Sequence, residues 1–324
     1  MKIPHCRAGT WPERRVDRFA SRIRGGEARG EPIALLGLPD ELGVRMNGGR
    51  AGASQGPSAF RRALASFGTG WDGGEGRVLE IGVFDAGDVE PAEGEGEEAL
   101  EETHSRVTEA ARALHEAGMI VVAVGGGHDL TYPTVRALAE HAGSAVGGMN
   151  VDPHLDVRET AGSGMPYRAL IEGGHVDAER FVEFGVGRWV NSREHVEYLT
   201  GKGSVLIGVE RALAHPAAMN VAFERISRGM AEPAFVSVDL DVIDGSQAPG
   251  VSAVNPMGLP VELVGRMAWR AGAHPSVRHF DLMELSPRHD DYGGGDMGSG
   301  VGRTARVAAL LFLQFLAGVQ ERAS

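Results

Sequence analysis

Eight short apolar runs, rich in β-branched residues, recur along the 324-residue chain and constrain its fold more than any other feature. They lie at 32–38, 78–83, 119–124, 145–151, 181–186, 204–209, 234–240 and 277–282. Most of these runs are continuous rather than alternating, which is typical of strands that are buried on both faces. We therefore interpret each run as a strand of one sheet.

Segments with helical periodicity separate several of these runs. The clearest lie at 99–117, 130–141, 216–229, 260–273 and 303–319. Alternation of strand and helix predicts parallel βαβ units. We therefore expect a three-layer α/β fold in which a mainly parallel, eight-stranded sheet lies between two layers of helices. The Gly-rich stretches at 43–56, 161–174 and 293–302 are expected to be long loops.

No change in composition marks a second domain, so residues 32–324 are expected to form a single domain. Residues 1–31 are polar and mixed in charge, and we expect them to form a loosely held N-terminal lead-in with one helix at most. An α/β fold of this length is often one domain.

Composition excludes several classes of function. The chain has 32 Lys and Arg against 44 Asp and Glu, a formal net charge of −12, which argues against a binder of nucleic acid or anionic membranes. Cys6, the single cysteine, excludes an internal disulfide and a Cys-based zinc site, and it fits a reducing compartment. The sequence has no secretory signal and no run of about 18 apolar residues, so we expect a cytoplasmic protein that spans no membrane.

Ionisable side chains directly follow four of the predicted strands. Ligands of open α/β sheets bind outside the carboxyl ends of the strands. The four strand ends lead into Gly-Gly-Gly-His-Asp at 125–129, Asp-Pro-His-Leu-Asp at 152–156, Asp-Leu-Asp-Val-Ile-Asp at 239–244 and Asp-Leu-Met-Glu at 281–284. These segments are expected to bring two histidines and several carboxylates to one rim of the sheet.

Side chains at i, i+2 and i+4 of an extended segment point to the same side. We therefore expect Asp152, His154 and Asp156 to lie together, and Asp239 to lie beside Asp241. Such groups would repel one another or stay desolvated unless cations lay among them. Oxygen-rich ligands with two imidazoles and no thiolate suit Mn²⁺ better than a structural Zn²⁺, and a carboxylate can bridge two metals.

Each motif has an ordinary structural alternative. Either Asp-rich motif alone is a weak signal, and the second could be a capped turn; Gly125–Gly127 alone could be a tight turn into a helix. The glycines do not form a P-loop, because no Lys-Ser/Thr follows them. The order of the motifs and their common position at strand ends favour the metal site. The other histidines lie in apparent helices or loops, where surface or core roles are expected.

The motifs G-G-G-H-D, D-x-H-x-D and S-x-D-x-D-x-x-D and a late Glu, over residues 32 to about 315, resemble the ureohydrolase family of arginases, agmatinases and formimidoylglutamases. The resemblance implies a binuclear manganese site, and it implies a homo-oligomer, since the family is commonly trimeric or hexameric. The implied ligands are His128 and Asp156 for one ion, His154 and Asp241 for the other, and Asp152 and Asp239 as bridges. It also aligns Glu284 with the acidic residue that receives the amidine-type nitrogen of the substrate.

Three further segments resemble formimidoylglutamases in particular: 43–57, 163–168 and 248–253. The implied substrate-binding residues are Asn47, Arg50, Ser163, Arg168 and Glu284. A planar guanidinium matches a carboxylate, which favours Arg168 as the carboxylate-binding residue. Plain roles are the alternative: Asn47 in a turn, Arg50 as a surface cation, Arg168 in a salt bridge.

Three positions depart from the family pattern. Pro153 stands where the family usually has Ala, and Gly245 stands where it usually has Pro. Where arginase has a histidine that is thought to shuttle protons, this loop has Tyr167 or Arg168. The last departure speaks against arginine as the substrate.

The resemblance implies hydrolysis of N-formimino-L-glutamate to L-glutamate and formamide, a step of histidine degradation, by a hydroxide that bridges two Mn²⁺. The expected catalytic residues are Glu284, which would bind the amidinium, and Asp156 or a neighbour, which would relay a proton to the leaving amine. Two alternatives remain open. One is an agmatinase or another guanidino-acid ureohydrolase, and the other is a catalytically silent relative that only binds metal or a partner.

Overall fold

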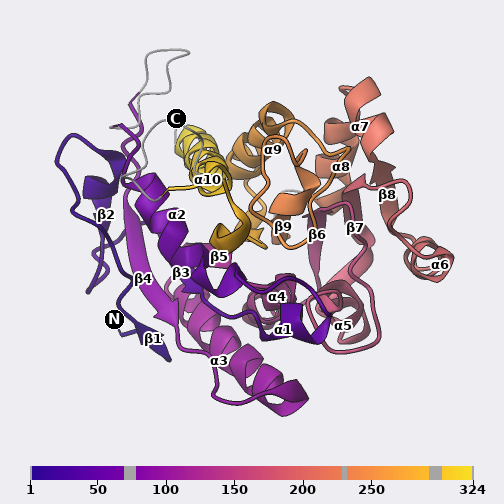
Figure 1. Ribbon diagram of the computed structural model, residues 1–324, viewed down its shortest axis with the longest axis horizontal. Coiled ribbons are helices and arrows are strands. Elements are labelled where there is room, and N and C mark those ends of the chain that lie inside the picture. Colours follow the sequence, from indigo (N-terminus) through magenta and orange to yellow (C-terminus); the bar gives the residue numbers. More distant parts are fainter. Residues whose placement is uncertain (1, 69–77, 228–231, 292–300, 323–324) are drawn as a thin grey trace.

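The computed structural model describes residues 2–68, 78–227, 232–291 and 301–322 and contains one sheet (Figure 1). The strands are β1 (Cys6–Arg7), β2 (Ile23–Arg24), β3 (Ile33–Leu38), β4 (Val83–Val89), β5 (Ile120–Gly125), β6 (Val146–Val151), β7 (Val176–Val186), β8 (Val205–Gly208), β9 (Ala234–Asp239) and β10 (Val277–Met283). Their order in the sheet is β1-β4-β3-β5-β10-β9-β6-β7-β8, and β2 pairs with β4. Every pair is parallel except β1 with β4, so the mainly parallel sheet is confirmed. The predicted number of eight strands was wrong: the sheet of the described residues has 10, because the two-residue strands β1 and β2 are too short to show a pattern.

Helices cover both faces of the sheet. They are α1 (Leu42–Met46), α2 (Gly56–Leu64), α3 (Gly96–Glu116), α4 (Thr131–Ala142), α5 (Pro166–Glu172), α6 (Arg193–Gly201), α7 (Val209–Ala214), α8 (Ala218–Ile226), α9 (Val261–Ala273) and α10 (Arg303–Glu321). None of the helices in the described residues has the length and apolar character that a membrane span requires.

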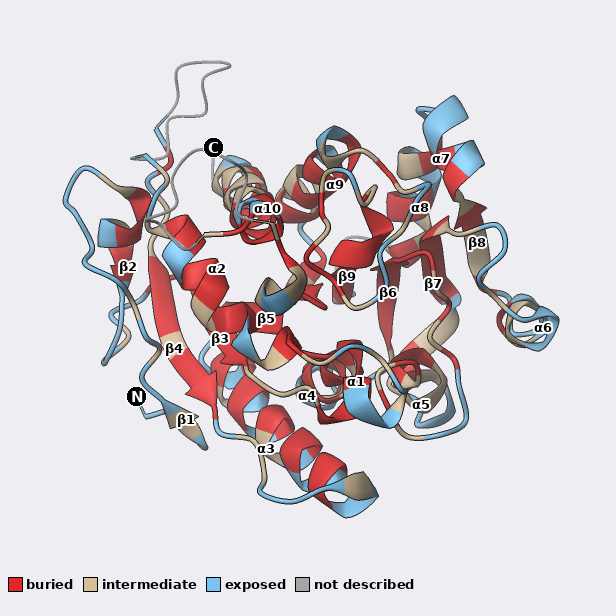
Figure 2. Cartoon of the chain, viewed as in Figure 1, coloured by how far each residue is buried: buried red, intermediate tan, exposed pale blue. Residues whose placement is uncertain are grey.

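The side chains of β3 show how the three layers form. Leu35 belongs to the core under α2 and α10, where it joins Phe60 and Phe312, whereas Leu36 points to the opposite face and joins Val107 of α3. Because successive residues of a strand face opposite sides, a strand buried on both faces has to be apolar throughout. Figure 2 shows the buried strands between helices whose outer faces are exposed, and the three-layer fold is confirmed.

Seven of the eight predicted strands coincide with strands of the structure, but the one at 78–83 was wrong. Strand β4 begins at Val83, and its sequence contains the buried carboxylates Asp85 and Asp88. Both pair with Arg61 of α2, which is 1% exposed, and Arg61 Nη2 lies 2.9 Å from Asp85 Oδ1. Because an ion pair and not an apolar pattern satisfies this strand, hydrophobic periodicity could not find it.

The segments predicted to be loops are more ordered than expected. The N-terminal lead-in supplies β1, β2 and one short 3-10 helix, η1 (Phe19–Arg22), and β1 pairs with the edge strand β4. The stretch 43–56 contains most of α1, and 161–174 contains α5. These helices have five and seven residues, too few to show a period. Most of the stretch 293–302, and residues 228–229 of the predicted helix 216–229, lie outside the described residues.

The order of the strands determines where a site can form. Strands β5 and β6 follow each other in sequence, yet β10 and β9 lie between them in the sheet. Strand order therefore reverses here, and ligands of open α/β sheets bind at the carboxyl ends around such a switch point. The four adjacent strands β5, β10, β9 and β6 are the ones that lead into the four charged segments.

Candidate metal centre

The segment after β5 places His128 at the start of a short 3-10 helix, η3 (His128–Leu130). Glycine is required before it because the backbone passes very close to a neighbouring loop: a Cβ on Gly126 would lie 1.7 Å from the carbonyl oxygen of Asp40. This close approach brings the His128 backbone to the rim, where its N–H donates to Glu284 Oε1 at 3.0 Å.

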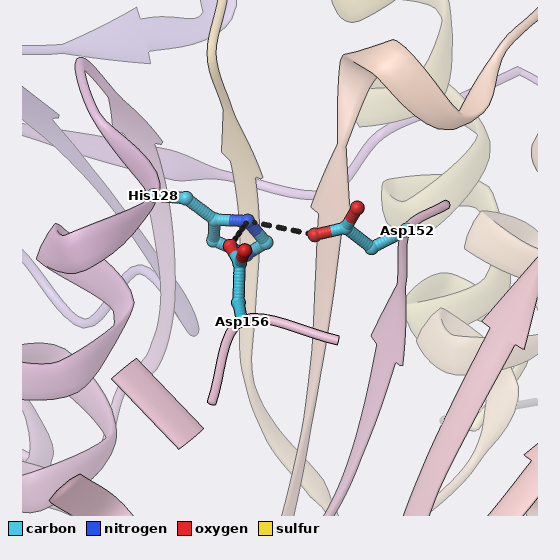
Figure 3. Close-up of side chains that lie close together, drawn as sticks. All are labelled: His128, Asp152 and Asp156. Atoms are coloured by element: carbon cyan, nitrogen blue, oxygen red, sulfur yellow. Dashed lines mark ion pairs between the residues drawn. The ribbon is translucent and has the colours of Figure 1, made fainter. Parts of the chain in front are cut away.

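One half of the site gathers around His128, whose side chain is 1% exposed. Its Nδ1 lies 3.0 Å from Asp152 Oδ2, 3.1 Å from Asp156 Oδ2 and 3.1 Å from Asp239 Oδ2. Figure 3 shows the carboxylates of Asp152 and Asp156 converging on this nitrogen from two sides. We call His128, Asp156, Asp239 and this oxygen of Asp152 the His128 half.

The other half gathers around His154, whose side chain is 34% exposed. Its Nδ1 lies 3.3 Å from both Asp152 Oδ1 and Asp241 Oδ2. We call His154, Asp241 and this oxygen of Asp152 the His154 half. Asp152 therefore places one carboxylate oxygen in each half. The structure thus brings together all six residues that the sequence proposed as ligands.

The reason predicted for this convergence was wrong for residues 152–156. Strand β6 ends at Val151, and Asp152 Oδ1 accepts the backbone N–H of His154 at 2.6 Å, which closes a turn. Asp156 then adopts a left-handed backbone with φ 45°. A tight turn, not an extended strand, brings the three side chains together, and short Asp side chains favour such turns.

The donor set fits divalent cations. His128 Nδ1, Asp241 Oδ1 and Glu284 Oε2 are buried without a hydrogen-bond partner in the described residues. Buried polar atoms are otherwise almost always satisfied, so these atoms call for a ligand. Within the described residues, two groups have metal-ligand spacing: His128 with Asp152 and Asp156, and Asp152 with His154 and Asp241. Imidazole nitrogens and carboxylate oxygens without thiolate are typical ligands of Mn²⁺.

The electrostatics of the protein groups lead to the same conclusion. Burial, and then the neighbouring Asp241, raises the pKa of Asp239 well above its usual range, and burial raises the pKa of Asp241 to about 6. Burial opposes a charge on His128, but Tyr167 and the three carboxylates beside its ring outweigh burial and raise the pKa of this imidazole. Without a cation, protons must therefore neutralise the cluster. Metal ligation needs bare imidazoles and ionised carboxylates, and bound cations stabilise those forms.

Glu284 follows β10 and adopts a left-handed backbone with φ 63°. Its Oε1 is held by the His128 N–H, and its Oε2 has no partner in the described residues. Burial, and then Asp239, raises the pKa of Glu284 well above its usual range. Glu284 and Asp156 are two of the three described non-glycine residues with positive φ, and backbone strain of this kind clusters at functional sites.

At the rim, Asn47 and Ser163 meet although 116 residues separate them in sequence. Asn47 Nδ2 donates to Ser163 Oγ at 3.1 Å, and Arg158 Nη1 donates to Asn47 Oδ1 at 3.2 Å. Sequence reasoning missed Arg158. Its position two residues after Asp156, in the loop that carries candidate ligands, was a signal that could have identified it.

The guanidinium groups of Arg168 and Arg50 both make hydrogen bonds to loops of the chain. Arg168 Nε donates to Val157 O at 2.7 Å, its Nη1 lies 3.0 Å from Glu159, and its guanidinium stacks 4.1 Å from the centre of the Tyr198 ring. The guanidinium of Arg50 donates to the carbonyl oxygens of residues 251 and 252. Each of the two arginines therefore holds a loop of the chain. Tyr167 is fully buried in α5 and is therefore not a mobile proton shuttle.

Comparison with known proteins is consistent with this geometry. Residues 31–318 match the model of the family described as "Arginase family". Formimidoylglutamase from Aromatoleum aromaticum is 33% identical over 300 residues, covering 86% of this chain and 81% of that protein. Formimidoylglutamase from Halobacterium salinarum is 34% identical over 279 residues, covering 84% of each chain. The crystal structure of Trypanosoma cruzi formiminoglutamase with Mn2+2 has a TM-score of 0.81 at 30% identity, covering 91% of this chain and 96% of that one.

Proposed function

We propose that this chain, which belongs to the arginase family, hydrolyses N-formimino-L-glutamate to L-glutamate and formamide with two Mn²⁺ in its metal centre. The observation that carries the proposal is the pair of ligand groups that share Asp152. The relatives named formimidoylglutamase support the substrate, and the Trypanosoma cruzi structure supports the metal. At the level of the family, the chain is a hydrolase that acts on C–N bonds of linear amidines.

The proposed ligands follow the two halves. His128 and Asp156 would hold one ion and His154 and Asp241 the other, and Asp152 and Asp239 would serve both. Asp152 is suited to bridging because its two oxygens lie in different halves, whereas Asp239 Oδ1 also accepts the Asp241 N–H at 2.8 Å. When bound, the two ions supply a Lewis acid and lower the pKa of water at the centre.

The protein groups orient the substrate. The Glu284 carboxylate is fixed through Oε1, so Oε2 is free to accept a charge-assisted hydrogen bond from the amidinium. The oxygen of water bonds to the formimino carbon, and the bond from that carbon to the glutamate nitrogen breaks. The leaving nitrogen needs a proton, and Asp156 is the proposed relay because its strained backbone holds its carboxylate at the centre.

The substrate also carries two carboxylates, and recognition of these falls to the rim. Arg158, Asn47 and Ser163 form one hydrogen-bonded group there, and Arg158 is exposed. Because Arg158 follows Asp156 by two residues, we expect it to reach a substrate whose amidinium lies on Glu284. We therefore assign to Arg158 the carboxylate-binding role that the sequence had suggested for Arg168.

A substrate panel assayed with Mn²⁺ tests the function. The wild-type chain should turn over N-formimino-L-glutamate with a kcat/KM about 100-fold or more above that for agmatine or arginine. A preference for agmatine would favour the agmatinase alternative, and Mn²⁺ binding without turnover of any compound would favour the silent relative.

Two arginine variants test the rim. Arg158→Ala should lower kcat/KM for N-formimino-L-glutamate by roughly 30- to 1000-fold, because a charge-assisted pair to a desolvated carboxylate is lost. Arg168→Ala is the matched control and should keep nearly full kcat/KM, since this guanidinium binds its own loop. The opposite ranking of the two variants would return the role to Arg168.

We also propose that the chain acts in histidine degradation, in the cytoplasm and as a homo-oligomer. The first follows from the proposed substrate, and the second is supported by the single cysteine. The oligomer stays a prediction from the family, and light scattering of the purified protein would measure it.

A further inference from the structure

The Nε2 atom of His128, on the side of the ring away from the carboxylates, also has close protein contacts. Its Nε2 lies 3.0 Å from Tyr167 Oη and 3.0 Å from Ser237 Oγ. All three residues are buried, with 1% exposure for His128 and 0% for the other two. Each of the two hydroxyls could donate to Nε2 or accept from it. Which of these holds depends on where each hydroxyl sends its single proton.

Asn150, at the end of β6, determines which group the Tyr167 hydroxyl donates its proton to. The Asn150 amide nitrogen lies 2.9 Å from Glu183 Oε2 and 3.3 Å from Asp152 Oδ2, and it donates to both. The amide oxygen of Asn150 is therefore turned towards Tyr167, whose hydroxyl donates to it at 2.9 Å. The proton of Tyr167 is used in this bond, so its oxygen can only accept from His128 Nε2.

A second series of hydrogen bonds shows that Ser237 also accepts from His128. The Thr131 hydroxyl donates to Asp281 Oδ2 at 3.1 Å, because a carboxylate only accepts. Ser237 Oγ lies 3.3 Å from Thr131 Oγ1, and only Ser237 has a proton left for this bond. The oxygen of Ser237 is therefore also an acceptor for His128 Nε2.

Two independent hydrogen-bond chains thus place a proton on His128 Nε2. When the imidazole is neutral, as metal ligation demands, Nδ1 carries the lone pair. This bare Nδ1 is the nitrogen that lies 3.0 to 3.1 Å from three carboxylate oxygens and has no hydrogen-bond partner of its own. The Asn150 amide also holds Asp152 Oδ2, the oxygen that Asp152 places in the His128 half.

We propose that Tyr167 and Ser237 are positioning residues that lock His128 in the tautomer whose Nδ1 faces the metal, and that Asn150 and Thr131 set the direction of both bonds. This inference rests on the proposed function only in requiring that divalent cations occupy the centre. Groups behind a metal-bound histidine fix its tautomer and ring orientation, and their loss typically costs 10- to 100-fold in metal affinity.

The His154 half provides an internal comparison. In the described residues, no protein group makes a hydrogen bond to His154 Nε2, and the side chain is 34% exposed. Removing the acceptors behind His128 should therefore weaken one cation and spare the other. A general loss of stability would not select between the two in this way.

Tyr167→Phe and Ser237→Ala test the proposal, with Mn²⁺ affinities measured by calorimetric titration in the absence of substrate. Phenylalanine keeps the ring packing of Tyr167, whose centre lies 4.9 Å from that of Phe181. Each variant should lower the affinity for one of the two Mn²⁺ by about tenfold, and the double variant should lower it by about 100-fold or more. The affinity for the other Mn²⁺ should stay within about threefold of the wild-type value. Tyr198→Phe is the matched control and should change neither, because its hydroxyl contacts Glu172 on the surface.

The affected ion is identified in two further backgrounds. In the His154→Asn protein, Tyr167→Phe should still weaken the remaining ion by about tenfold, and in the His128→Asn protein it should have no effect. If the wild-type protein binds two Mn²⁺ and the variants Tyr167→Phe and Ser237→Ala bind both ions with the same affinities, this inference alone is overturned. Wild-type protein that binds no Mn²⁺ would overturn the proposed metal centre, and this inference with it.

Discussion

The two halves of the metal centre use the same residue types but hold them in different ways. His128 is 1% exposed, its Nδ1 meets three carboxylate oxygens at 3.0 to 3.1 Å, and two hydroxyls contact its Nε2. His154 is 34% exposed, and its Nδ1 meets two carboxylate oxygens at 3.3 Å. The comparison teaches that one half is a preorganised part of the core, whereas the other is open to solvent and to incoming ligands.

The largest effect should come from the residue that belongs to both halves. Asp152→Asn removes charge from both halves, so we expect loss of both Mn²⁺ and a fall in kcat of about 1000-fold or more. Asp244→Asn, in the loop after β9, is the matched control, because its carboxylate binds Ser246 instead. Elemental analysis and turnover measure the result. If Asp152→Asn kept one ion at wild-type affinity, the two halves would not share this carboxylate.

The two histidine variants should separate the halves. His128→Asn and His154→Asn should each leave about one ion per chain and lower kcat by about 100-fold, since each removes one imidazole ligand. Elemental analysis after gel filtration gives the stoichiometry. Equal loss of both ions from either variant would contradict the split of ligands between the halves.

The His154 half should also respond to acid through Asp241. Burial raises the pKa of this carboxyl from 3.8 to about 6, and a cation must displace its proton below that pH. The affinity for the ion in this half should therefore fall by up to about tenfold per pH unit below about pH 6. Titrations with Mn²⁺ between about pH 5 and pH 8 measure the slope. Because His154 is also protonated over this range without metal, the outcome that would contradict the role of Asp241 is a slope no steeper below about pH 6 than above it.

The metal-free protein should show the opposite trend for the same group. A raised pKa in the folded state means that the folded chain binds the extra proton, so this contribution to the free energy of unfolding is full below about pH 4. It is lost as the pH rises through about 6. Thermal unfolding of chelator-treated protein across this range tests the sign.

The smallest effect is expected from Pro153, which lies between the proposed ligands Asp152 and His154. Its carbonyl oxygen accepts Gly187 N at 2.9 Å and Asn191 Nδ2 at 2.8 Å, and Pro153→Ala keeps both bonds. We expect a change in Mn²⁺ affinity below about threefold and a loss of stability below about 1 kcal/mol from greater freedom in the unfolded chain. A loss of Mn²⁺ affinity above tenfold would show that the His154 half depends on the proline ring.

The sequence was informative where chemistry follows a buried strand. The candidate ligands could be proposed because parallel strands end at one edge of the sheet, so His128, Asp152 and Asp241 were expected to lie close together whatever the turns between them. The turn itself was not predictable, since Asp156 needs a positive φ that no residue pattern announced.

Contacts between distant segments could not be read from the sequence. The sequence suggested Arg168 as a carboxylate-binding residue but gave no sign of its hydrogen bonds to Val157 and Glu159. The hydrogen bonds behind His128 depend on residues such as Ser237, which is 109 positions away. The motif S-x-D-x-D-x-x-D contains Ser237, but nothing in that motif indicates a contact with His128. Strand β4 was missed for a related reason, because its carboxylates are satisfied by an arginine from another element.

The placement of β10 has a consequence for how the chain is made. Among the described strands this one comes last in the sequence, yet it lies between β5 and β9 in the middle of the sheet. Until residues 277–283 leave the ribosome, β5 and β9 each present an unpaired edge, and such edges are prone to pair with other chains. We therefore expect biosynthesis of this protein to include a late and vulnerable interval, which ends when a single inserted strand joins the two parts of the sheet and completes the rim at Glu284.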